Sequence, residues 1–186
     1  MSDFYKLKTA GASPLSVADA KAFMKVTSAS EDTLITALIN TATEFGENYT
    51  GREFRANTWI LYLDEFATRI GIRKSPVATI TSIKHLVSDI LTAVSDATYY
   101  LKKFAICSEI LLVSGSDWPT NTDDREQAIE IEFVTESYYR SAEILQALKL
   151  HVSFLYVNRG DCSCDSSSAK ESGASLIYDQ FRIPRI

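Results

Sequence analysis

Apolar side chains recur at helical spacing in three segments of the chain. The first segment follows Ser16, which can cap a helix because Asp19 occupies the third helical position. The second and third repeat apolar residues along one face for about four turns each. They stop at Gly51 and Gly160, and glycine readily adopts the left-handed conformation that ends helices. The pattern therefore predicts helices over 16–25, 31–50 and 142–159.

Between these segments the pattern changes to the period of strands. Residues 128–134 alternate Ile129, Ile131 and Phe133 with glutamates, which predicts a strand with one buried and one wet face. We also expect a hairpin of residues 58–64 and 70–73, and strands over 82–87, 99–101 and 109–113. No crossover helix separates these segments, so the pairing is expected to be antiparallel.

The order of these elements predicts an α+β fold in a single domain over residues 1–186. Helices from the N- and C-terminal parts form a small helical bundle, and an antiparallel β region is inserted over about 54–136. Residues 160–172 contain no large apolar side chain and are predicted to form a flexible linker.

An apolar, doubly basic segment follows the linker. It is expected to form a helix over 173–182 that either packs on the other helices of its own domain or docks on a partner. The candidate partner-binding residues comprise three apolar anchors and two cations: Phe181, Ile183, Ile186, Arg182 and Arg185.

Charge and composition narrow the function classes. The chain has 19 Lys and Arg against 24 Asp and Glu, a formal charge of −5, which disfavours indiscriminate binding to nucleic acid or to an anionic membrane. No apolar stretch approaches the roughly 20 residues of a spanning helix, and the first residues lack a signal-peptide pattern. We expect a protein made in a cytoplasm, with its three cysteines reduced.

Candidate chemistry is sparse. The two histidines, His85 and His151, are too few for a histidine metal triad, and Cys162 and Cys164 supply only two of the four ligands of a closed zinc site. Common nucleotide-binding and hydrolase motifs are absent from the sequence. We therefore expect no enzyme activity, no metal and no cofactor. Four acidic residues are interpreted as solvated and not as a catalytic pair: Asp123, Asp124, Glu130 and Glu132.

One long run of residues resembles a known family. Residues 30–52, Ser-Glu-Asp-Thr-Leu-Ile-Thr-Ala-Leu-Ile-Asn-Thr-Ala-Thr-Glu-Phe-Gly-Glu-Asn-Tyr-Thr-Gly-Arg, are similar to the signature helix of the head-tail connector proteins (adaptor or head-completion proteins) of long-tailed bacteriophages and prophages. Further matching segments follow in the family's order: Thr58-Trp59, Ser75-Pro76-Val77, Trp118-Pro119, residues 128–133 and Asn158-Arg159.

The resemblance implies a structural virion protein. In the virion many copies, by resemblance twelve, form a ring under the portal protein that extends the DNA channel and docks the next neck or tail-completion protein. The resemblance also implies assembly in the host cytoplasm. Asp123, Asp124, Glu130 and Glu132 would suit a channel lining that lets DNA slide without specific binding. The alternative is a soluble DNA-packaging accessory protein, which would need a basic face; the only small cationic clusters are 69–74 and 102–103.

Overall fold

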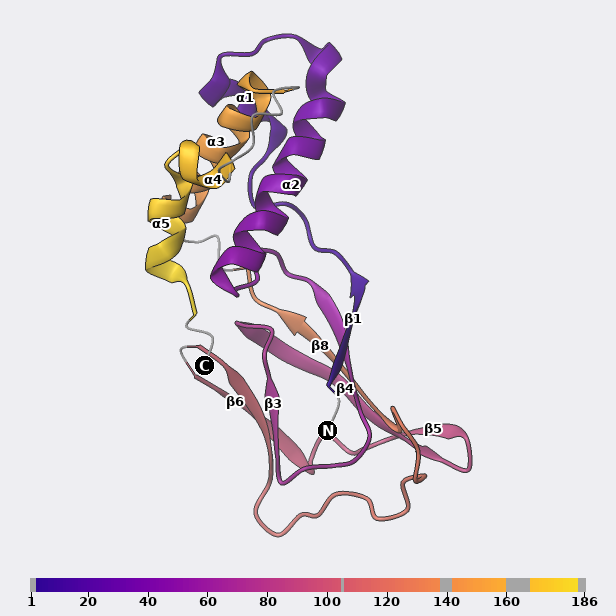
Figure 1. Cartoon of the computed structure of the whole chain (residues 1–186). Helices are drawn as coiled ribbons and strands as arrows, with labels where there is room; N and C mark the ends of the chain where they lie inside the picture. Colours follow the sequence, from indigo (N-terminus) through magenta and orange to yellow (C-terminus); the bar gives the residue numbers. More distant parts are fainter. Residues whose placement is uncertain (1–2, 105, 138–141, 160–167, 184–186) are drawn as a thin grey trace. The chain divides into compact units, whose positions relative to one another are not determined.

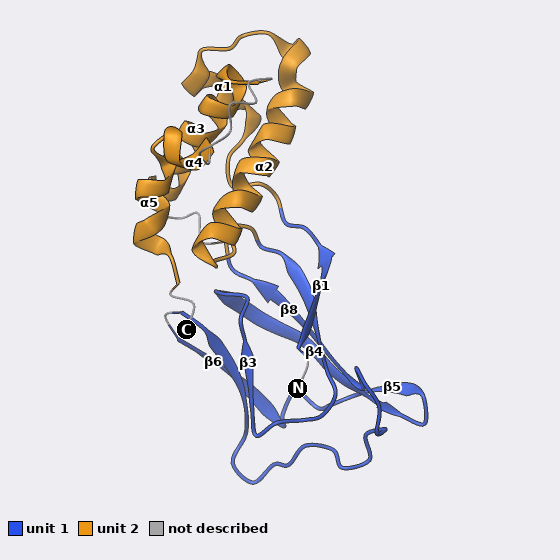
Figure 2. Cartoon of the chain, in the orientation of Figure 1, with its two compact units in different colours: residues 1–11, 56–136 blue, residues 12–55, 137–186 orange. Residues whose placement is uncertain are grey.

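The computed structural model describes residues 3–104, 106–137, 142–159 and 168–183. The chain divides into two compact units, which are distinguished by colour in Figure 2. A β unit comprises Met1–Gly11 and Ala56–Glu136, and a helical unit comprises Ala12–Arg55 and Ser137–Ile186. The predicted α+β class, with a β region inserted between N- and C-terminal helices, is confirmed.

The helical unit is built from α1 (Val17–Met24), α2 (Asp32–Thr50), α3 (Ala142–Val157) and α5 (Ala174–Phe181). Two short helical turns, η1 (Ala29–Glu31) and α4 (Ser168–Glu171), precede α2 and α5. Ser16 caps α1 as expected, because its Oγ accepts the backbone N–H of Asp19 at 3.0 Å. Gly51 ends α2 with a φ of 72°. The short helix α4 falls inside the range that the sequence assigned to a linker, and residues 160–167 of that range lie outside the described residues.

The core of the helical unit lies between α2, α3 and α5, which pack against one another (Figure 1). Its fully buried side chains come from one face of each helix, which is the stripe that the helical spacing indicated. They include Ile35, Ile39, Ile144, Leu148 and Tyr178. Gly46 permits the close approach of α5, since a Cβ at this position would lie 2.6 Å from Phe54 Cε2 and 3.2 Å from Tyr178 Cζ.

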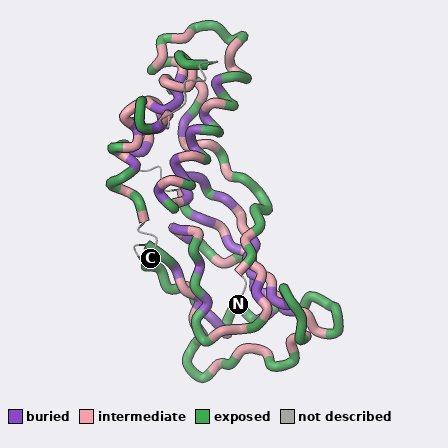
Figure 3. Tube along the Cα trace, in the orientation of Figure 1, coloured by how far each residue is buried: buried purple, intermediate pink, exposed green. Residues whose placement is uncertain are grey.

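The β unit contains two antiparallel sheets. Five strands, β1 (Phe4–Thr9), β2 (Thr58–Leu63), β8 (Ile129–Thr135), β4 (Val77–Val87) and β5 (Ile90–Ala93), are hydrogen-bonded in that order. The second sheet has the order β3 (Arg69–Ile72), β7 (Ser108–Leu112) and β6 (Tyr99–Lys103). Both sheets contribute to one apolar core, in which Leu61, Ile83 and Ile131 meet Ile70 and Ile110. Figure 3 shows the buried positions along these strands.

The predicted hairpin of residues 58–64 and 70–73 is wrong. Its two halves are strands, but β2 pairs with β1 and β8, whereas β3 pairs with β7 in the other sheet. The connection between them carries Phe66, whose ring stacks on Trp118 with a centroid distance of 4.7 Å. Both strands therefore pair with partners that are distant in the sequence.

Candidate interaction surfaces

The side chains with catalytic or metal-binding chemistry lie apart from one another, and both histidines already form hydrogen bonds within the fold. His85 is buried with its Nδ1 3.0 Å from Thr122 Oγ1, and His151 is buried with its Nε2 2.8 Å from Ser168 Oγ. Burial lowers the pKa of His151 to about 4. Within the described residues no three His, Cys, Asp or Glu side chains form a group that could hold a metal ion. Cys107 is an exposed free thiol, and Cys162 and Cys164 lie outside the described residues.

Two of the four candidate acidic residues lie in the segment before β8. The carboxylate of Asp123 accepts the backbone N–H groups of Ser88 and Asp89, both at 2.9 Å, in the turn between β4 and β5. These hydrogen bonds hold the pKa of Asp123 below its usual range. Asp123 therefore fixes a turn, while Asp124 beside it is exposed.

The other two acidic residues lie on β8 between cations. Glu132 accepts a hydrogen bond from Lys8 Nζ of β1 at 2.8 Å, and its side chain is only 13% exposed. Glu130 stands opposite Lys84 of β4 in the strand register. The alternation that identified their face was correct, but both glutamates are partly buried, and Lys8 forms an ion pair with Glu132.

The cationic clusters 69–74 and 102–103 come together in the three-stranded sheet, because β3 and β6 both flank β7. They do not form a uniformly basic face. Glu109 of β7 lies opposite Lys102 in the register, Lys103 pairs with Glu136 at 3.0 Å, and Arg73 pairs with Asp3 at 3.7 Å. Acidic partners thus accompany most of these cations.

The C-terminal segment is attached to its own helical unit as far as it is described. Tyr49 of α2 donates a hydrogen bond to the Asp179 carboxylate at 2.6 Å, which raises the pKa of Tyr49. The backbone N–H of Ile183 donates to the Thr50 carbonyl at 2.8 Å, and Arg182 lies over the Tyr49 ring. Phe181 and Ile183 are consequently half-buried, whereas Arg182 is exposed. Arg185 and Ile186 lie outside the described residues.

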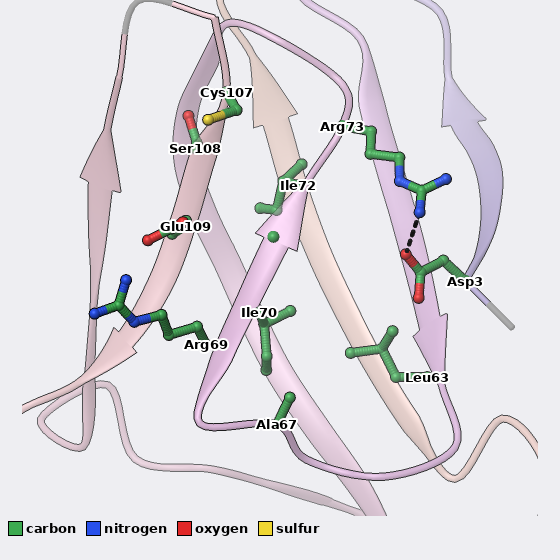
Figure 4. Close-up of a pocket in the computed structure, with 11 residues that line it drawn as sticks. Asp3, Leu63, Ala67, Arg69, Ile70, Ile72, Arg73, Cys107, Ser108 and Glu109 are labelled. Carbon is green, nitrogen blue, oxygen red and sulfur yellow. Dashed lines mark ion pairs between the residues drawn. The ribbon is translucent and has the colours of Figure 1, made fainter. Parts of the chain in front are cut away.

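A groove of about 270 Å³ runs along β3 in the β unit (Figure 4). Ile70 and Ile72 of β3 line it on one side and Leu63 of β2 on the other. At its rim Arg73, with a side chain 81% exposed, meets the carboxylate of Asp3. The groove could not be predicted from the sequence, because it depends on β3 joining a different sheet from β2.

In the part of the chain that the structure describes, no helix has both the length and the apolar character needed to cross a membrane.

Comparisons with known proteins agree with this architecture. Residues 14–100 match the family model described as phage gp6-like head-tail connector protein, and a comparison with curated proteins gives no match. This match confirms the resemblance seen in the sequence: residues 14–100 are similar to phage gp6-like head-tail connector proteins. Head-tail connector proteins of this family are structural virion proteins, which agrees with the expectation that the chain is not an enzyme.

Three solved structures share the fold at 18% sequence identity. A chain in the neck of an empty gene transfer agent particle, computed with C6 symmetry, has a TM-score of 0.79, with 98% of this chain and 97% of that chain covered. A chain from the virion of the native particle gives 0.78, with 98% and 96% covered. A chain in the native particle's neck, computed with C12 symmetry, gives 0.70, with 98% and 97% covered. The likeness extends over both units and gives no support to the alternative of a DNA-packaging accessory protein.

Proposed function

We propose that this protein forms a homo-oligomeric ring in the neck of a tailed phage or phage-like particle, directly under the portal protein. The observation that carries the proposal is the match of residues 14–100 to the head-tail connector family. The fold adds support, since nearly the whole chain superimposes on chains from particle necks that were computed with C6 and C12 symmetry. A ring of twelve copies would match the symmetry of such a neck.

The ring extends the DNA channel and docks the next neck or tail-completion protein. The net charge of −5 suits a channel in which DNA slides without specific binding, because strong phosphate attraction would slow its passage. In this proposal Asp124 is the best-placed acidic residue for a lining role, since it is exposed. The other three acidic residues would add negative charge while already engaged in the fold. Asp123 accepts hydrogen bonds from a turn, Glu132 pairs with Lys8, and Glu130 stands opposite Lys84.

The C-terminal residues Phe181, Arg182, Ile183, Arg185 and Ile186 are proposed to bind the portal protein. The described part of this segment supports two roles. Tyr49 and Thr50 of α2 hold its start by hydrogen bonds, and the exposed Arg182 side chain can contact a partner. A segment fixed at its root presents its remaining side chains with less loss of conformational entropy on binding.

Particles made without the protein test the location. We expect filled heads and complete tails to accumulate separately and heads to lose DNA in the host lysate. Normal joining of heads and tails would contradict it.

Two variants test the C-terminal segment separately. Deleting residues 173–186 also removes α5 and so changes the helical core. Replacing Arg182 and Arg185 with Ser leaves the apolar packing of α5 in place, and we expect this variant to keep its melting temperature and to lose attachment to portal-bearing heads. Unchanged attachment would end the portal-binding proposal and leave the ring untouched.

A further inference from the structure

The strand β3 has an unpaired edge beside the groove. It is the terminal strand of its sheet and pairs with β7 alone. In an antiparallel pair every second residue directs its N–H and C=O away from the partner, so β3 presents backbone donors and acceptors on its open side. Among the described side chains, the Tyr5 hydroxyl alone meets one of these groups: it accepts the N–H of Arg73, just past the end of the strand, at 3.1 Å.

The side chains along this edge alternate in character. Ile70 and Ile72 are buried toward the groove, whereas Arg69, Gly71 and Arg73 belong to the opposite, exposed set. A Cβ built on Gly71 would have no atom within 4 Å, so the exposed surface is open between the two arginines. An added strand would therefore meet an apolar row on one face and a cation, a gap and a cation on the other.

The rim already binds a carboxylate. Asp3 lies 3.7 Å from the Arg73 guanidinium across the groove (Figure 4), and Arg69 at the other end of β3 forms no ion pair with any described residue. Glu109 of β7 lies opposite Gly71, on the paired side of β3, and places one negative charge between the two arginines. The two strand ends thus favour acidic side chains, with Asp3 as an internal competitor at one of them.

We propose that the edge of β3 docks an extended segment of another protein, which adds as a strand and carries the pattern acidic, apolar, aromatic, apolar, acidic. The apolar pair enters the groove beside Ile70 and Ile72, the aromatic ring covers Gly71, and the acidic ends meet Arg69 and Arg73. The pattern reads the same in both directions, so the proposal holds for a parallel or an antiparallel addition.

The occupant is a different protein and not a second copy. No five-residue window of the 186 residues carries this pattern. The proposal rests on the proposed function only in taking the occupant to be a neighbouring protein in the particle neck. Its test uses the isolated chain, so that the docking proposal and the proposed function can fail separately.

The test is binding of a fluorescent peptide, Gly-Ser-Asp-Val-Tyr-Val-Glu-Ser-Gly, to the full-length protein by anisotropy. A matched peptide has Lys in place of both acidic residues. We expect the acidic peptide to bind at least about tenfold more tightly, with added hydrogen-exchange protection at residues 69–72. Asp3→Asn should strengthen binding, because it removes the competing carboxylate.

Two variants separate recognition from stability. Replacing both Arg69 and Arg73 with Glu is expected to reverse the preference toward the lysine peptide. Gly71→Val is expected to keep the melting temperature, because the space there is open, and to weaken the acidic peptide about fivefold or more. Binding of neither peptide at about 1 mM by the wild-type chain or Asp3→Asn, or a preference unmoved by the charge reversal, would overturn the proposal and leave the arginines as protection of an exposed edge.

Discussion

Glu47 of α2 and Arg55, which follows the helix, form a buried ion pair in the helical unit. Arg55 Nη2 lies 2.6 Å from Glu47 Oε2, and both side chains are about one-tenth exposed. Glu47 Oε1 also accepts the backbone N–H groups of Phe54 and Arg55 at 2.9 and 3.1 Å. One carboxylate therefore shapes the chain as it leaves α2.

Glu47→Gln is expected to destabilise the protein by about 3 kcal/mol or more, because it removes the carboxylate charge that lies closest to the buried Arg55 guanidinium. Urea unfolding followed by circular dichroism measures this loss. The matched control is Glu44→Gln, whose carboxylate is 64% exposed and lies 3.9 Å from Arg55. An equal effect of both substitutions would contradict the assigned role of Glu47.

Gly46→Ala tests the close packing of α2 on Phe54 and Tyr178. Alanine in a helix is normally more stable than glycine by about 1 kcal/mol. Here the added Cβ would lie 2.6 Å from the Phe54 ring, so we expect a net destabilisation of about 1–3 kcal/mol. The double variant with Phe54→Leu should recover part of the loss in the same unfolding measurement. A gain in stability from Gly46→Ala alone would contradict the assigned close packing of Gly46 against Phe54 and Tyr178.

Tyr178→Phe is expected to be neutral or to stabilise the protein by up to about 1 kcal/mol. The Tyr178 hydroxyl is buried and has no hydrogen-bond partner among the described residues, so its removal relieves a desolvated polar group. The matched control is Tyr99→Phe, because the Tyr99 hydroxyl donates to Asp96 at 2.7 Å and its loss should cost about 1 kcal/mol. Thermal unfolding of the two variants should shift in opposite directions or differ clearly in size.

His151 makes the stability of the helical unit dependent on pH. Burial lowers its pKa from 6.5 to about 4, so between these values the unfolded chain binds more protons than the folded one. The stabilisation is complete above about pH 6.5 and is lost as the pH falls toward 4. Between pH 7 and 5 the wild type should lose about 2 kcal/mol more than His151→Gln, which does not titrate. If urea unfolding shows that the wild type and His151→Gln lose the same stability between pH 7 and 5, this assignment is wrong.

The helices were predictable because their signals are local. Ser16 and Gly51 fix helix ends through neighbouring backbone groups, and the apolar stripe of α2 identifies its buried face without reference to the rest of the chain. The β unit was predictable only in part. The alternation in β8 located its buried face, but β1 and β5 are short edge strands with mostly exposed side chains and give a weak pattern.

The pairing of strands and the interaction surfaces depend on distant residues. Nothing near β2 or β3 indicates that the two belong to different sheets, and the groove along β3 arises from that separation. Lys8 and Lys84 likewise reach Glu132 and the position opposite Glu130 from strands far away in the sequence. A carboxylate that appears solvated from alternation alone is therefore partly covered in the fold.

Electron cryomicroscopy of the particle neck can locate the proposed ring. We expect a closed ring of copies of this chain immediately below the portal, with both units of each copy resolved and DNA passing through the centre. Density for the chain elsewhere in the particle, or a neck in which the portal contacts the next component with no such ring between them, would contradict it.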